Sequence, residues 1–175
     1  MVQRIVLICL LGTLPAMAWG QQPPDLRTLE QQVFSAFVAA CESPNLAATV
    51  QAFESAAETF LQQSSETNLS QGLLATARIM LAESMINPLD KLNQFTTYKV
   101  PLEAAISADS DNPSLRLLRL SVQHSVPAFL GYFHEIEEDL EAVTRAQASG
   151  YWNGHAILEN FVSEFLIILA HDHSE

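Results

Sequence analysis

Apolar residues beyond Pro24 recur at intervals of three or four positions, and this spacing is typical of α-helices. The first such stripe runs through Leu29, Val33 and Phe37. No convincing alternation of apolar and polar residues, which would indicate a half-buried strand, occurs in the chain. The spacing therefore predicts an all-α fold of about seven helices that pack as antiparallel hairpins, in one domain over residues 21–175.

Residues that cap helices recur directly before proline. The three predicted helix starts of this kind are Ser43-Pro44, Asn87-Pro88 and Asn112-Pro113. The side chain before the proline accepts a hydrogen bond from a free amide of the first turn, where proline has no amide to lose. We expect Asn68 to cap a further helix. Pro101 lies inside a helical pattern, so we expect a kink or a short break near Lys99.

Two of the predicted helices are defined by their apolar residues. The fourth carries Leu89, Leu92 and Phe95 on its apolar face. The last, which follows Gly150 and is marked first by Trp152, contains the most apolar stretch of the chain beyond residue 20, Phe165–Ala170. That stretch is either a core helix or a hydrophobic wall between hairpins that receives a partner peptide.

The first twenty residues have the layout of a secretory signal peptide. Arg4 precedes an apolar run over Ile5–Leu14, and Ala16 and Ala18 form a small-residue cleavage pattern. A membrane-spanning helix needs about 20 apolar residues, and this run is about half as long. We therefore predict a signal peptide over residues 1–20, export to the periplasm or the medium, and no stable membrane insertion after cleavage. An uncleaved signal anchor is the alternative.

The charge of the chain argues against two classes of partner, nucleic acids and anionic lipids. Asp and Glu total 20 against 8 Lys and Arg, giving a formal net charge of −12. Nucleic acids and anionic lipids require clustered basic residues, so neither is an expected partner. Cys41 is the one cysteine beyond the predicted signal peptide, and it falls on the apolar side of a predicted helix. We therefore expect a buried, inert thiol there.

A short segment resembles the junction between consecutive tetratricopeptide repeats. Ala105 and Ala108 allow close approach of helices, Asp109 ends one helix, and Asn112-Pro113 begins the next. The preceding helix lacks the aromatic and glycine pattern of such repeats, and no second copy is visible. This resemblance implies a degenerate repeat fold rather than a regular array.

A longer segment, about residues 70–145, is similar to a group of uncharacterised exported helical proteins of Gram-negative bacteria. The similarity rests on the block Arg116–Gln123, the block Pro127–Tyr132 and the acidic helix that begins at Ile136. It implies a setting in the bacterial envelope. It implies neither a reaction nor a ligand, and no catalytic residue is carried over.

The candidate binding residues are Arg116, Arg119, Gln123, Tyr132 and Asp139. The first three share one side of a predicted helix, because they stand at positions i, i+3 and i+7. Two hypotheses follow. The arginines grip the carboxylate or phosphate of a ligand, or they form an internal ion-pair network with Asp139 that fixes how two helices pack.

Other polar clusters give weaker indications. The segment His171-Asp172-His173 resembles a small metal-binding tail, but a tight site needs three or four fixed ligands, so no metal or other cofactor is expected. The acidic run Glu135–Glu141 is expected to be a solvated helix face. No motif of nucleophilic catalysis or phosphate binding is present.

These observations predict an exported, non-enzymatic module that binds a protein or peptide in the cell envelope. The alternative is a small ligand-binding protein or enzyme with a polar pocket around Arg116, Arg119, Tyr132 and Asp139. A structural envelope component is a third possibility. A compact cavity lined by those four residues would favour the alternative, whereas an open groove with aliphatic walls would favour the interaction module.

Overall fold

The computed structural model describes residues 25–43 and 46–172, and in these ranges every regular element is helical. The seven α-helices and two short 3-10 helices are α1 (Leu26–Glu42), α2 (Leu46–Gln63), α3 (Thr67–Met80), η1 (Leu81–Ser84), α4 (Pro88–Ala108), α5 (Pro113–Ser125), η2 (Ala128–Leu130), α6 (Ile136–Ala148) and α7 (Ala156–Asp172). The all-α prediction with about seven helices is confirmed. The predicted signal peptide and His173 lie outside the described residues. Pro44 of the predicted helix start Ser43-Pro44 also lies outside them.

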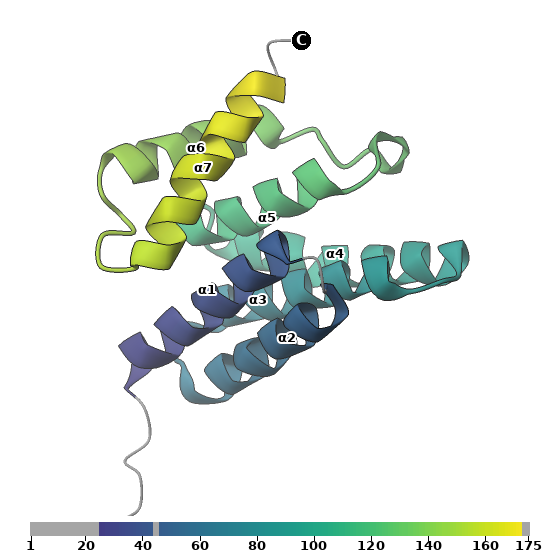
Figure 1. Cartoon of the computed structure of the whole chain (residues 1–175), viewed down its shortest axis with the longest axis horizontal. Helices are drawn as coiled ribbons and strands as arrows, with labels where there is room; N and C mark the ends of the chain where they lie inside the picture. The colour runs from purple at the N-terminus through teal and green to yellow at the C-terminus, as the bar shows by residue number, and fades with distance from the viewer. Residues whose placement is uncertain (1–24, 44–45, 173–175) are drawn as a thin grey trace, which may run out of the picture.

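Consecutive helices pack side by side, first α1 with α2, then α2 with α3 and α3 with α4. After α4 the chain forms a second group, in which α5 packs on α6 and α6 on α7 (Figure 1). Contacts of α3 with α5 and of α1 with α7 join the two groups. The helix α3 is therefore central, since it touches α2, α4 and α5.

The capping predictions at the two Asn-Pro pairs are confirmed. The Asn87 side chain accepts a hydrogen bond from the amide of Leu89 at 3.0 Å, and Asn112 accepts one from Ser114 at 3.0 Å. The prediction for Asn68 is wrong, because α3 begins at Thr67 and Asn68 is its second residue. The preceding turn starts this helix earlier, where the Ser64 hydroxyl accepts a hydrogen bond from the amide of Glu66 at 3.0 Å.

The predicted break at Pro101 does not occur, because α4 continues through it from Pro88 to Ala108. Packing holds the helix on both sides of the proline. Phe95 is buried before it, and Leu102 and Ile106 are buried after it. Tertiary contacts thus outweigh the hydrogen bond that proline cannot donate.

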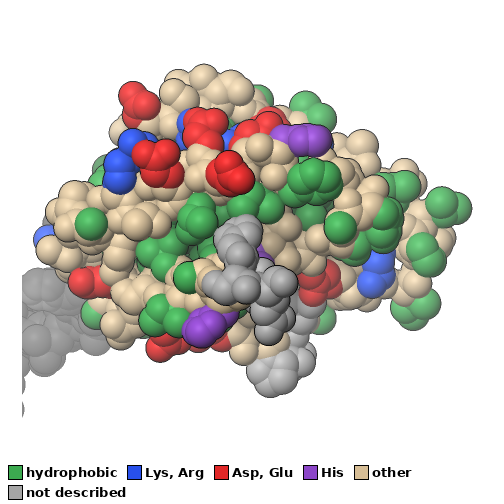
Figure 2. Space-filling view, turned by 90° about the horizontal axis from the view of Figure 1, so that it is seen from above, with side chains coloured by type: hydrophobic (Ala, Val, Ile, Leu, Met, Phe, Trp, Pro, Cys, Tyr) green, Lys and Arg blue, Asp and Glu red, His purple; other side chains and the backbone are tan. Residues whose placement is uncertain are grey.

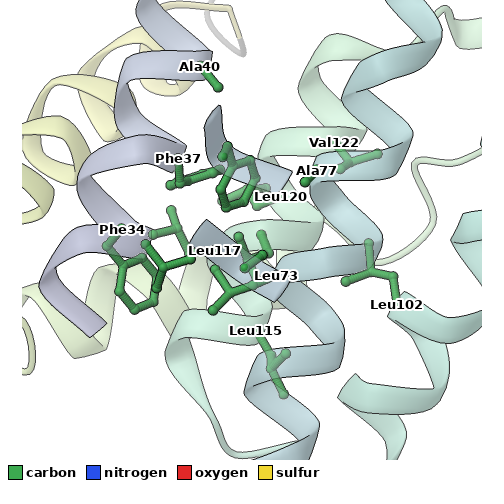
Figure 3. Packing of buried hydrophobic residues seen from close by; sticks show 14 of the residues in the cluster. Phe34, Phe37, Ala40, Leu73, Ala77, Leu102, Leu115, Leu117, Leu120 and Val122 are labelled. Atoms are coloured by element: carbon green, nitrogen blue, oxygen red, sulfur yellow. The ribbon is translucent and has the colours of Figure 1, made fainter. Parts of the chain in front are cut away.

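The core is a layer of aliphatic and aromatic side chains between α1, α3 and α5. Figure 3 shows Phe37 of α1 facing Leu120 and Leu117 of α5, with Leu73 of α3 beside them. All of these side chains are fully buried. Gly72 lies where α3 meets α5, and a Cβ there would come within 2.3 Å of Leu115. A glycine at this position therefore permits the close contact of the two helices.

The turn between α6 and α7 is built on glycines and one tryptophan. Gly150 follows the end of α6 with φ 72°, a left-handed conformation that glycine adopts readily. Trp152 was expected within the last helix, but it lies in this turn, four residues before α7 begins. It is buried, and its indole N–H donates to the Ser114 hydroxyl at 3.4 Å. The turn is thereby anchored to the start of α5.

One apolar face is incompletely covered. Of the three residues predicted on the apolar face of α4, Phe95 is buried, whereas Leu89 is 68% exposed and Leu92 is 44% exposed. Among the described residues, no helix combines the length and apolar character needed to cross a membrane. Because Leu89 and Leu92 are exposed, the start of α4 is part of the protein surface.

Candidate functional site: an apolar groove backed by an arginine network

A groove of about 760 Å³ lies among the ends of several helices and is mainly apolar. Its walls come from the end of α1, the end of α3 with η1, the start of α4, the end of α5 with η2, and α7. The apolar residues that line it are Ala40, Ile79, Met80, Ala82, Pro88, Leu89, Leu92, Phe95, Val122, Val126, Pro127, Phe129, Leu130, Phe161, Phe165 and Ile168. Its volume is in the range of natural ligand sites, about 300–1,000 Å³.

The lining of this groove is accessible to solvent. Phe129 is 85% exposed and Ile168 is 49% exposed, in addition to Leu89 of α4. Figure 2, seen from above, shows hydrophobic side chains across the middle of the molecule and at its right end, the end where Figure 1 places the η1–α4 segment. Exposed apolar side chains that cluster around a hollow indicate a binding surface rather than an enclosed core.

The last helix is partly buried in the core and partly exposed at the groove. Phe161, Phe165 and Leu169 of α7 are buried in the core, while Ile167 and Ile168 are exposed. Phe161, Phe165 and Ile168 line the groove. One side of α7 thus packs into the protein, and part of the same helix forms a groove wall.

Charged residues at the groove are mostly acidic. Glu42 of α1, Glu83 of η1 and Glu164 of α7 line it, against a single lysine, Lys91 of α4. The Lys91 ammonium donates to the backbone carbonyl of Glu83 at 3.3 Å. Within residues 25–43 and 46–172, none of the three glutamate side chains forms an ion pair. The groove therefore presents uncompensated negative charge to an incoming ligand.

Cys41 also lines the groove, which corrects the expectation of a buried thiol. The residue is exposed in the last turn of α1. Desolvation by the surrounding protein atoms, with the negative charges of Glu42 and Glu83, raises the pKa of this thiol to about 12. The thiolate is the reactive form of cysteine, and the raised pKa keeps the Cys41 thiol protonated. Although Cys41 is exposed, it is therefore not expected to act as a nucleophile.

Behind one wall of the groove lies a charged network centred on Asp139. This residue has no exposed surface, unlike the rest of the acidic run at the start of α6, so the expectation of a solvated face is wrong at this position. Arg119 donates from Nε to Oδ2 at 2.6 Å and from Nη2 to Oδ1 at 2.7 Å. Arg116 donates to Oδ1 at 2.9 Å and forms a second ion pair with the exposed Glu138 at 3.0 Å. The two arginines of α5 thereby hold α6.

Glu103 of α4 completes the network and was not among the predicted site residues. It accepts a hydrogen bond from Arg119 Nη1 at 3.0 Å and another from the Tyr132 hydroxyl. The sequence contained a weak signal, because Glu103 is a single carboxylate between apolar residues of one helix. Its partner arginine is 16 residues away in the chain.

The pKa values of Arg119 and Tyr132 are both raised in the network. Burial lowers the pKa of Arg119, but the hydrogen bond and charge of Asp139 and the charge of Glu103 more than offset it, so that the pKa is raised. Burial and the hydrogen bond to Glu103 raise the pKa of Tyr132 well above its usual range. Arg119 is therefore charged and Tyr132 neutral at ordinary pH, as a fixed internal network requires.

The structure thus brings together four of the five predicted site residues and leaves one apart. Arg116, Arg119, Tyr132 and Asp139 share the network, whereas the side-chain amide of Gln123 is buried without a hydrogen-bond partner in the described part of the chain. None of these five residues lines the groove. The arginine donors that a ligand anion would need are directed at Asp139, Glu138 and Glu103.

The network touches the groove wall through Tyr132. Phe95, Lys99 and Glu103 lie at successive i, i+4 positions on α4, and each contacts Tyr132. The Phe95 ring meets the Tyr132 ring edge-on with centroids 5.5 Å apart, and the Lys99 ammonium lies 4.6 Å from the Tyr132 centroid. Since Phe95 also lines the groove, the network helps to position the α4 wall.

Two of the described histidines, His124 and His155, lie in different pockets. His124 lines the groove and meets Phe165 edge-on, while His155 lines a smaller pocket of about 310 Å³ beside Glu30 and Glu66. Over the described ranges, no three His, Cys, Asp or Glu side chains are grouped so that they could hold a metal ion. The segment His171-Asp172-His173, at which no metal is expected, includes His173, which lies outside those ranges.

Comparison of the chain with protein-family models, with curated proteins and with solved structures finds no match. The groove and the network are therefore interpreted from their own chemistry.

Proposed function

We propose that this protein is an exported, non-catalytic binding module that holds an apolar helical segment of another protein in its groove. The observation that carries the proposal is the cluster of exposed apolar side chains around a hollow of about 760 Å³. An amphipathic helix that lays its apolar face into such a groove is a common mode of peptide recognition. The open, apolar lining, both aliphatic and aromatic, supports a helix more than it supports a small polar substrate.

The setting of the protein in the bacterial envelope rests on the sequence. Residues 1–20 combine a basic start, a short apolar run and small residues at the expected cleavage site. The likeness of the helix junction at Asp109 to tetratricopeptide repeats fits a module whose hairpins form a groove. Expression in a Gram-negative host, fractionation and an intact mass of the recovered protein test export and cleavage together. Recovery of the uncleaved chain from the cytosol would contradict this part.

The polar-pocket alternative lacks a supporting observation. An anion site needs arginine donors that point into a cavity, but the N–H groups of Arg119 are hydrogen-bonded to Asp139 and Glu103. A buried guanidinium requires such internal carboxylates to offset the loss of its hydration. The network is accordingly part of the scaffold that holds the groove.

The groove is tested with a neutral amphipathic peptide of about 18 residues, long enough to form a helix, with leucines at helical spacing. Binding is measured by isothermal titration calorimetry to the purified protein. Leu89→Glu and Ile168→Glu place a charge in the groove on two different walls, and each is expected to weaken binding about tenfold or more. Both residues are exposed, so folding is retained.

Matched controls come from the same two helices. Val100→Glu on α4 and Ile157→Glu on α7 change exposed apolar residues that do not line the groove. They are expected to bind the peptide like the unmodified protein. Equal loss in the controls, or no binding of the peptide by the unmodified protein, would contradict the proposed function.

A further inference from the structure

The charges around the groove indicate which kind of helix it takes. This step rests on the proposed function, since it concerns the partner of the same groove. We propose that the partner is a basic amphipathic helix, with lysine or arginine beside its apolar face. Three observations support this: the acidic residues that line the groove, the hydrogen bond of Lys91, and the charge of the whole chain.

The acidic residues lie on three of the elements that line the groove. Glu42 is the last residue of α1 and Glu83 belongs to η1, and both line the groove together with Cys41. Glu164 is on α7, which packs against α1. All three side chains are exposed and, in the part of the chain that the structure describes, unpaired. Basic side chains beside the apolar face of a docked helix would meet these carboxylates.

The wall formed by the start of α4, next to η1, is mainly apolar. The start of α4 offers Leu89 and Leu92, and its Lys91 is directed to the carbonyl of Glu83. An acidic ligand would therefore meet one lysine and three glutamates. Complementary charge favours the right partner and speeds its association, while like charge rejects wrong partners.

The same charges disfavour a second copy of this chain as the occupant. The protein has a formal net charge of −12, so two copies repel each other. An acidic groove filled by an acidic neighbour would leave the three glutamates unpaired. The partner is thus a different chain, one that is basic where this one is acidic.

The test compares three peptides that share one leucine stripe and differ only beside it, with lysine, glutamine or glutamate at the flanking positions. The lysine peptide is expected to bind most tightly and the glutamate peptide least. The advantage of lysine over glutamine should shrink as salt is raised, because exposed ion pairs are screened. The double variant Glu42→Gln/Glu83→Gln should reduce this advantage about two- to fivefold for each carboxylate removed.

The matched control is Glu137→Gln/Glu141→Gln, which removes the same charge from the exposed face of α6 and should leave the lysine advantage intact. Equal binding of the three peptides, with loss in Ile168→Glu, would overturn the basic-helix inference and leave the proposed function standing. Binding of no peptide would overturn both. Self-association in sedimentation, with no peptide bound, would identify a second copy as the occupant and would also overturn the inference.

Discussion

Arg119 donates two parallel hydrogen bonds to Asp139, from Nε to Oδ2 at 2.6 Å and from Nη2 to Oδ1 at 2.7 Å. Both side chains are buried. This bidentate pair joins α5 to α6. A third guanidinium nitrogen of Arg119 reaches Glu103 of α4. One arginine on α5 therefore fixes the positions of two other helices, one of which forms a wall of the groove.

Arg119→Leu is expected to lower the free energy of unfolding by about 3–5 kcal/mol, because it leaves Asp139 buried without its main partner. Urea unfolding followed by circular dichroism measures the change. Arg145→Leu is the control, since the ion pair of Arg145 with Glu141 is exposed and should contribute less than about 1 kcal/mol. If Arg119→Leu keeps its stability and loses binding of a small anion instead, the network is a ligand site.

Tyr132→Phe tests the attachment of the segment after η2 to α4. The variant removes the hydroxyl that donates to Glu103 and keeps the ring that packs on Phe95 and beneath Lys99. We expect a loss of about 1–3 kcal/mol in stability, since a partly buried carboxylate loses a donor. Tyr98→Phe, on the same helix, is the control and should change stability by less than about 0.5 kcal/mol. Equal effects of the two variants in thermal unfolding would contradict the role given to Glu103.

Much of the fold could be predicted because the relevant signals are local. The Asn-Pro pairs at Asn87 and Asn112 place two helix starts, since the cap and its amides are within three residues of each other. Periodicity marks the apolar face of α4, but it does not say what covers that face. Leu89 and Leu92 lie on that face with Phe95, but the structure leaves them exposed while Phe95 is buried.

The site was harder to predict because it depends on residues distant in the chain. Arg116, Arg119 and Asp139 were grouped correctly, since their charges are opposite and the first two share a helix face. Glu103 was missed, because its contacts with Arg119 and Tyr132 span 16 and 29 residues. The groove itself is formed by the ends of α1, α3, α4 and α5 with α7, and no local pattern specifies such a junction.

Alkylation of Cys41 should report its raised pKa. The folded thiol has a pKa of about 12 against an ordinary value of 9.0, so little thiolate forms at pH 8. After allowing for the greater nucleophilicity of a less acidic thiol, reaction with iodoacetamide should be roughly 30- to 100-fold slower in the folded protein than in urea. Mass spectrometry of the Cys41 peptide measures both rates. The folded rate should still rise with pH beyond pH 10, and a plateau near pH 9 would contradict the raised pKa.

Pro101→Ala should stabilise the protein, because a proline inside a helix removes one hydrogen bond and crowds the preceding turn. The new amide of residue 101 can donate to the carbonyl of Thr97 within the continuous helix α4. We expect a gain of about 1–3 kcal/mol in the free energy of unfolding, seen as a higher melting temperature. The variant Ser107→Ala, near the exposed end of the same helix, controls for the added alanine and should change stability by less than about 0.5 kcal/mol. An unchanged or lower melting temperature for Pro101→Ala would mean that the rest of α4 is built around the proline.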